Sequence, residues 1–400
     1  MRLLLAGIVA TVLLAVGGEA VRRVAGDDGG NAPADLARRL AWERLIREQD
    51  MIFFQRRIER DPTGALDLIR LGSLYLQRFS ESGEEADLVS AEAAARRSLA
   101  NRAQRNEAAW QLLTTALIGQ HRFIEARAAA EVLVTVDPEN AVFRATLGEV
   151  LLELGEYERA DSLFRPLLPR RYEAALTPRY ARWLELRGKV GEARRLLEAA
   201  RDDAFQHADA IPVQQLAWYE LRLGELALRY GATAEARRRL DRGLTLVPDD
   251  WRLLAARARL ALATRDFNLA VALGDSSLAR HLDPATLAAV GDAWLARGDT
   301  TVAEDYYRAM EAATRAPRGG FHRAWYLALL DHGRRIPEIL AAVQTDLETR
   351  KDVYGYDLLA WALFKSGRTA EASQAMAAAL AWGSEDPQLL AHAAAIEAAR

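Results

Sequence analysis

Residues 147–160 read LGEVLLELGEYERA, and the same spacing returns about every 34 residues along the chain. Gly148 is followed twelve positions later by Ala160, and Gly224 is followed in the same way by Ala236. Further pairs with this spacing are Ala258 with Ala270, Gly291 with Ala303, and Ala360 with Ala372. A fixed period of roughly 20–50 residues is typical of an array of identical supersecondary units. The pattern therefore predicts a repeat protein.

Each unit contains two amphipathic helices joined by a short turn. Leu147 and Leu151 fall on one face of the first helix, and Tyr157 and Phe164 are spaced for the second. A small residue where the helices cross lets their backbones approach closely. The turn favours glycine, which takes a positive φ without strain. The expected turn residues are Gly155, Gly188, Gly231, Gly298, Gly333 and Gly367.

These residues resemble the sparse signature of the tetratricopeptide repeat family. Three segments carry it most clearly, namely 140–166, 218–248 and 356–379, and the resemblance extends over residues 63–400. It implies an all-α fold, an α-solenoid superhelix of about nine helix-turn-helix repeats. The chain from Tyr354 onward is similar to the C-terminal part of exported bacterial tetratricopeptide proteins of unassigned role.

The N-terminal 34 residues differ from the array. Leu3–Gly18 is an apolar run of sixteen residues, short for a membrane-spanning helix, which needs about 20. Arg22 and Arg23 follow it, and positive charge there works against translocation of that flank. Residues 1–20 are thus a cleaved signal peptide, a retained membrane anchor or neither. Either of the first two predicts a protein that is exported, periplasmic or extracellular, or anchored to the cytoplasmic membrane.

The remaining boundaries follow from breaks in the helical pattern. We expect a linker at 21–34, an N-terminal cap of one or two helices at 35–62, and the array at 63–400. Two departures from the period predict a surface loop at Phe79–Asp87 and a sub-break at 202–212. The last unit, from Pro387, keeps only its first helix, as a terminal capping unit would.

Composition argues against several classes of function. The 53 basic and 56 acidic residues give a net charge of −3, so we expect no nucleic acid partner. With no Cys in the chain, thiol catalysis and thiolate metal sites are excluded. The six His are scattered and show no zinc-enzyme spacing. We therefore predict no catalytic residue, no metal, no cofactor and no enzymatic activity.

In the tetratricopeptide family the first helices line a concave face that takes peptides, so the resemblance implies candidate partner-binding residues here. The Lys and Asn that clamp a terminal carboxylate in some members are missing, which argues against that mode of binding. Trp218 and Trp361 are the aromatic residues that we expect to be exposed. The candidates are Gln111, Glu149, Arg182, Trp218, Glu225, Arg259, Asp292, Arg323, Asp357 and Trp361.

Three hypotheses of function follow. The first is a non-enzymatic protein-protein interaction scaffold of the cell envelope, with a peptide or protein partner in its concave groove. The second is an accessory subunit of an envelope assembly or secretion machine, held in the membrane by residues 3–18. The third is an enzyme that uses the repeat platform to act on a peptide or polysaccharide.

Overall fold

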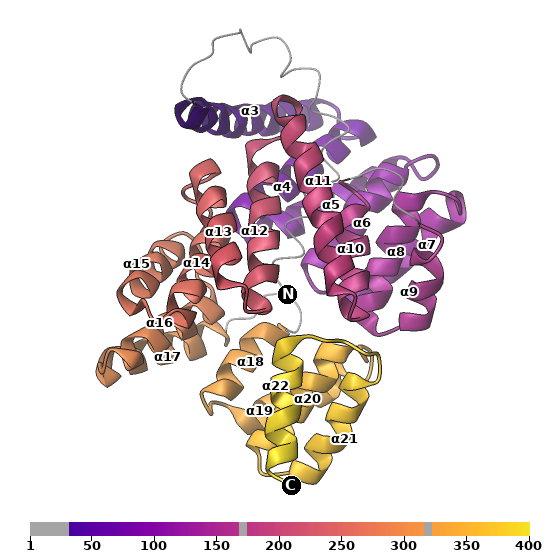
Figure 1. The fold of residues 1–400 in the computed structure, drawn as a ribbon. Helices are drawn as coiled ribbons and strands as arrows, with labels where there is room; N and C mark the ends of the chain where they lie inside the picture. The colour runs from indigo at the N-terminus through magenta and orange to yellow at the C-terminus, as the bar shows by residue number, and fades with distance from the viewer. Residues whose placement is uncertain (1–31, 168–173, 316–321) are drawn as a thin grey trace.

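The computed structural model describes residues 32–167, 174–315 and 322–400 (Figure 1). Within these ranges the chain forms helices and no β-strand. The predicted leader at 1–20 and most of the linker at 21–34 lie outside the described residues. The elements are α3 (Ala32–Arg60), α4 (Ala65–Ser82), α5 (Glu85–Asn101), α6 (Glu107–Gly119), α7 (Phe123–Val136), α8 (Ala141–Leu154), α9 (Tyr157–Phe164), α10 (Thr177–Leu186), α11 (Val190–Gln206), η1 (Ala208–Ala210), α12 (Val213–Arg229), α13 (Thr233–Leu246), α14 (Trp251–Ala263), α15 (Phe267–Leu278), α16 (Pro284–Ala296), α17 (Thr300–Ala313), α18 (Arg323–Asp331), α19 (Ile336–Asp346), α20 (Val353–Lys365), α21 (Thr369–Leu380) and α22 (Pro387–Ala398).

The described helices from α4 to α21 pair into nine consecutive hairpins, which confirms the predicted all-α solenoid. The first helix of each hairpin has an even number, from α4 to α20, and α22 is a single helix at the C-terminal end. The long helix α3 precedes the first hairpin. Successive hairpins stack side by side and wind into a superhelix (Figure 1).

Glycine occupies seven of the nine hairpin turns. Each of the six predicted turn glycines has a positive φ, between 67° and 90°. Gly83 serves the first hairpin in the same way, with φ 73°. His121 and Arg265 stand at the equivalent position of the second and sixth hairpins, with φ 58° and 62°. The left-handed conformation at this point is therefore a property of the repeat, which two hairpins form without glycine.

The small residues lie where the two helices of a hairpin cross. Ala160 is fully buried. A Cβ added to Gly148 would lie 2.6 Å from the ring of Phe164, and one added to Gly291 would lie 2.5 Å from the ring of Tyr307. An aromatic ring of the second helix thus fills the space that glycine leaves on the first.

The predicted loop at Phe79–Asp87 is wrong. Helix α4 continues to Ser82 and α5 begins at Glu85, so that only two residues separate them. Arg78 and Asp87 form an ion pair of 2.7 Å across this turn. The extra residues lengthen the two helices, which have 18 and 17 residues. Residues 202–212 contain the end of α11 and the short η1 before α12.

The superhelix closes on itself through four contacts of one kind. In each contact, the turn of one hairpin packs against a connection between two later repeats. The turn of the first hairpin meets the connection after the sixth hairpin, and the next three turns follow in the same order. Gly83 lies against His281, the His121 and His322 rings are 4.5 Å apart, Gly155 lies against Lys351, and Gly188 lies against Gly383. We call these four contacts the seam. They join residues about 200 positions apart and bring the C-terminal repeats below α9 and α10 in Figure 1.

The third of these contacts is the most extensively bonded. The Lys351 amide donates to the Leu154 carbonyl at 3.1 Å, and the Val353 amide donates to the Tyr157 hydroxyl at 2.7 Å. Arg350, which is buried, donates to the carbonyl and the carboxylate of Glu153 at 3.0 and 2.8 Å. Backbone and side chain together therefore fix the eighth hairpin on the third.

Helix α3 packs on the first hairpin and also reaches the middle of the array. Its Leu40 is buried among residues of α11 to α14, including Trp218. Arg44 donates to both carboxylate oxygens of Asp249 at 2.8 and 3.0 Å. No helix among the described residues combines the length and apolarity needed to cross a membrane.

Candidate functional site

One position recurs on the inner side of the first helices, six residues before the left-handed turn residue. From α6 to α20 it is occupied by Thr115, Glu149, Arg182, Glu225, Arg259, Asp292, Leu327 and Trp361. The first four side chains are buried, whereas the last four are half-buried. We call Arg259, Asp292, Leu327 and Trp361 the inner row.

At α10 the burial of this position follows from the seam. Arg182 on α10 lies beneath Tyr354 on α20, with its guanidinium carbon 4.9 Å from the ring centroid. It also donates to the Tyr354 hydroxyl at 3.1 Å. The C-terminal repeats therefore cover the inner side of α10, while the inner row from α14 to α20 stays accessible.

Polar side chains on the inner side connect consecutive first helices. Arg179 on α10 donates to Glu149 on α8, Arg222 on α12 to Glu185 on α10, and Arg259 on α14 to Glu225 on α12. In the C-terminal half, His332 at the end of α18 bonds Asp292 on α16, Trp361 on α20 donates to Asp331 on α18, and His392 on α22 bonds Asp357 on α20. Most charges on the inner side are thus used between repeats. We call this series the inner ladder.

Asp292 is the most strongly coordinated member of the inner row. It accepts from the Tyr307 hydroxyl at 2.7 Å and from His332 Nε2 at 2.8 Å, and its side chain is 39 % exposed. Burial opposes protonation of His332, but its hydrogen bonds to Asp292 and to the Ala328 carbonyl outweigh this and raise its pKa above 6.5. The bond to Asp292 therefore stabilises the imidazolium form relative to a histidine in water.

Trp361 is enclosed by polar groups. Its ring stacks on the His392 ring with a centroid separation of 4.1 Å, and the Lys365 ammonium lies 4.9 Å from the centroid of the indole. His392 in turn bonds the buried Asp357, whose pKa is raised by burial, an effect that the His392 hydrogen bond opposes. An indole held in this way offers a rigid, partly exposed apolar surface, the type of anchor that dominates many protein interfaces.

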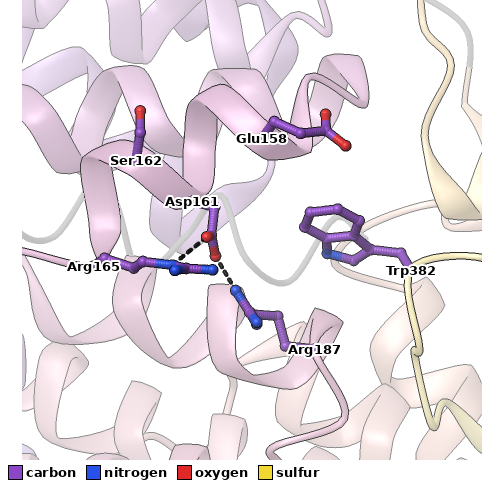
Figure 2. Close-up of a pocket in the computed structure, with 6 residues that line it drawn as sticks. All are labelled: Glu158, Asp161, Ser162, Arg165, Arg187 and Trp382. Atoms are coloured by element: carbon purple, nitrogen blue, oxygen red, sulfur yellow. Dashed lines mark hydrogen bonds and ion pairs between the residues drawn. The ribbon is translucent and has the colours of Figure 1, made fainter.

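A cleft of about 520 Å³ lies apart from the inner row, between α9, the end of α10 and the α21–α22 connection (Figure 2). Asp161 stands at its centre and is bonded by Arg165 and by Arg187, which approach it from two helices. Trp382 forms the opposite wall and stacks on Tyr157 with a centroid separation of 4.7 Å. Both guanidinium groups are directed at the carboxylate, so this cleft offers no unpaired charge at its centre.

Residues 117–177 match the tetratricopeptide repeat family model. They run from the end of α6 to the start of α10 and include the quoted residues 147–160. The chain contains tetratricopeptide repeats. No curated protein matches the sequence at the significance required.

Several solved structures are similar to this tetratricopeptide array. The crystal structure of the APC/C hetero-tetramer Cut9-Hcn1 is 15% identical, with a TM-score of 0.49 over 83% of this chain. This chain spans only 62% of that one. Yeast Tom70 is 14% identical with a TM-score of 0.42, over 92% of this chain and 88% of that chain. A tetratricopeptide repeat protein from Parabacteroides merdae ATCC 43184 is 13% identical with a TM-score of 0.26, over 82% and 98%.

The tetratricopeptide array places the ten predicted residues in two groups. Four are half-buried, and six are buried. The half-buried residues are Gln111, Arg259, Asp292 and Trp361, and the buried ones are Glu149, Arg182, Trp218, Glu225, Arg323 and Asp357. The expected exposure of Trp218 is wrong, because α3 and α13 cover its helix. A role in partner binding remains a prediction for all ten.

Arg323 illustrates what burial means for such a residue. Its guanidinium bonds Asp346 and Asp352 and donates to the Arg350 carbonyl at 3.0 Å. These contacts join the start of α18 to the end of α19 and the N-cap of α20. Arg323 therefore stabilises the connection between two repeats in this structure.

Sequence reasoning missed Leu327 and the cleft at Trp382. Leu327 is apolar, whereas the residue predicted to bind a partner on this helix is the charged Arg323. Counting six residues back from Gly333 would have identified Leu327. Trp382 follows α21 and has no fixed place in the repeat, so the sequence contains no signal that would bring it to α9. Among the described residues, no cluster of His, Asp and Glu could hold a metal ion.

Proposed function

We propose that this tetratricopeptide array is a non-enzymatic scaffold of the cell envelope that holds an extended segment of a partner protein along the inner row. Tetratricopeptide folds serve protein-protein interaction in general, and the inner row is the part of the predicted concave face that stays accessible. That one observation carries the proposal. It restricts binding to α14–α20, because the equivalent side chains on α8–α12 are buried.

The chemistry of the inner row suggests what the partner segment contains. Arg259 keeps a half-buried guanidinium that also bonds Glu225, and Asp292 keeps a half-buried carboxylate that also bonds Tyr307 and His332. Leu327 and Trp361 add a broad apolar surface, each one repeat further along the chain. An extended peptide with polar side chains towards one end and apolar side chains towards the other would meet these in order. Apolar contact with Trp361 would supply most of the affinity, and the two charges would fix the direction of the segment.

The envelope location rests on the sequence before α3. Leu3–Gly18 has the composition of an export signal or anchor. A membrane-anchored accessory subunit is the second candidate, and Arg22 and Arg23 directly after the apolar run favour it. N-terminal sequencing of the mature protein separates the two. A chain that begins near Val21 has lost the run, whereas one that begins at Met1 has kept it.

The test of the scaffold uses a photo-crosslinking residue at position 327 in the full chain, expressed in its own cells. Leu327 takes part in no polar pair, so its replacement leaves the inner ladder in place. The matched control carries the same residue at Val89, which is exposed on the outer side of α5. We expect one protein adduct from position 327 that is absent from position 89 and is lost in the Trp361→Ala background. Identical adducts from both positions, or none from 327, would refute the proposal.

A further inference from the structure

Helix α3 is apolar on two opposite sides. Leu40, Met51 and Ile58 are buried against the array. Four large apolar side chains lie on the other side and are each about half exposed: Trp42 at 49 %, Leu45 at 48 %, Ile52 at 49 % and Phe53 at 51 %. No other described helix exposes more than two large apolar side chains. A soluble helix rarely keeps such a group in water without a use for it.

The four side chains form a stripe on one side of the helix, with the exposed Gln49 between Leu45 and Ile52. At about 100° per residue, positions 42, 45, 52 and 53 fall within an arc of about 100° on the helix surface. Arg38 lies on the same side before the stripe, and Arg56 and Arg60 lie there after it. Of these, Arg38 is paired with Asp35, whereas Arg56 and Arg60 form no ion pair with a described residue. An apolar centre with arginine at its ends is typical of helices that lie in a membrane interface.

The position of α3 in the fold suits such a role. It lies across one end of the molecule, away from the C-terminal repeats (Figure 1). Thirteen residues separate the end of the apolar run at Gly18 from Ala32, where α3 begins. That length spans at most about 45 Å when fully extended. If the run is embedded in a bilayer, α3 is therefore held near the bilayer surface.

The composition of the apolar run Leu3–Gly18 argues against this run as the segment that covers the stripe. A segment that covered the stripe from within the chain would need one apolar and one polar side. Leu3–Gly18 has no charged residue and only Thr11 as a polar one, so it has no such side. We propose that the outer side of α3, formed by Trp42, Leu45, Ile52 and Phe53, binds the surface of a lipid bilayer with its axis parallel to the membrane. The inference is independent of which partner the inner row binds.

The chain has no Cys, so a single cysteine can carry a reporter. We would label Leu45→Cys in the full chain with an environment-sensitive nitrobenzoxadiazole dye and add vesicles of phosphatidylcholine with a minority of phosphatidylglycerol. We expect a blue shift and about a twofold rise in emission as the dye leaves water, with quenching by shallow nitroxide lipids. The matched control is Val136→Cys on α7, which is 54 % exposed and should not respond.

Three outcomes would overturn the inference. One is an unchanged spectrum at position 45, and another is an equal change at position 136. The third is a rise at position 45 that follows protein concentration without lipid, which would assign the stripe to a second copy of the chain. A Trp42→Ser/Ile52→Ser/Phe53→Ser background should abolish the response at position 45. Its helical circular dichroism should match the parent, since these side chains face water in the free protein.

Discussion

Arg259 donates a hydrogen bond of 2.9 Å to Glu225, and the two residues occupy the same position of consecutive repeats. Glu225 is buried, whereas Arg259 is 38 % exposed. This pair marks the point along the array where the inner side changes from covered to accessible. The Arg259 guanidinium thus bonds a buried carboxylate on one side, and its exposed side is part of the inner row.

Loss of this guanidinium should destabilise the array. Arg259→Met leaves the buried Glu225 carboxylate without its partner, and we expect a loss of about 1–3 kcal/mol in the free energy of unfolding. Glu225→Gln alone should cost less, and the double variant should cost less than the sum of the two, with a coupling of about 0.5–2 kcal/mol. Urea titrations of the four proteins measure this. Strict additivity would mean that the bond contributes nothing to stability.

Substitutions at two turn glycines can distinguish the cost of backbone strain in a hairpin turn from the cost of opening the seam. Gly155 and Gly367 have nearly equal φ, 80° and 77°. A Cβ on Gly155 would lie 2.2 Å from the Lys351 carbonyl oxygen, whereas one on Gly367 meets nothing within 4 Å. Each Gly→Ala substitution should cost about 1–2 kcal/mol for the left-handed backbone.

Only Gly155→Ala should also open the seam. We expect it to add about 1–3 kcal/mol to the loss in stability and to raise the radius of gyration in small-angle X-ray scattering, since the backbone at Lys351 must move away. Gly367→Ala should keep the parent radius. Equal radii and equal losses for the two variants would show that the seam does not restrain the C-terminal repeats.

The helix crossing offers a test by rescue. Gly148→Ala brings a methyl group to 2.6 Å from the fully buried Phe164 ring, and overpacking should cost about 1–3 kcal/mol. Phe164→Leu removes ring atoms and leaves a cavity, which is itself destabilising. The double variant should be more stable than the two single losses predict, because the methyl group occupies part of that cavity. If the stability loss of the double variant equals the sum of the two single losses, the added methyl group does not clash with Phe164. Thermal unfolding of the parent and the three variants gives the comparison.

Stability should depend on pH through His332. Its folded pKa lies above the unfolded value of about 6.5, so its contribution is fully present below pH 6.5 and is lost as pH rises through the folded pKa. The urea midpoint should therefore fall between about pH 6 and pH 8. Asp292→Asn removes the partner carboxylate and should flatten this part of the profile, while the other histidines contribute equally to both proteins. An identical fall in parent and variant would contradict the assignment to His332.

The repeat pattern was sufficient to predict the hairpins. The pairs spaced by twelve residues and the turn glycines each have a local cause, namely a close helix crossing and a left-handed backbone. His121 and Arg265 adopt that backbone without glycine, so glycine alone does not indicate the turns of these two hairpins. The predicted loop at Phe79–Asp87 failed for a related reason, because extra residues can lengthen two helices as readily as the loop between them.

The closure of the superhelix could not be predicted in this way. Gly155 and Lys351 are 196 positions apart, and neither residue departs from the repeat pattern in a manner that indicates its partner. The burial of Arg182 depends on that closure, because Tyr354 of α20 lies over it. The sequence of α10 alone therefore does not show that this position is covered. The partners in the inner ladder are also set by the stacking of whole hairpins.

The seam also means that the units of this array are not energetically independent. In an open solenoid each repeat contacts only its two neighbours, so shortening the chain at one end leaves the repeats at the other end unchanged. Here the turns of the first four hairpins rest on connections near the opposite terminus. A fragment cut cleanly between repeats, such as one that ends at Ala313, would therefore expose backbone and aromatic surface on hairpins that it retains intact.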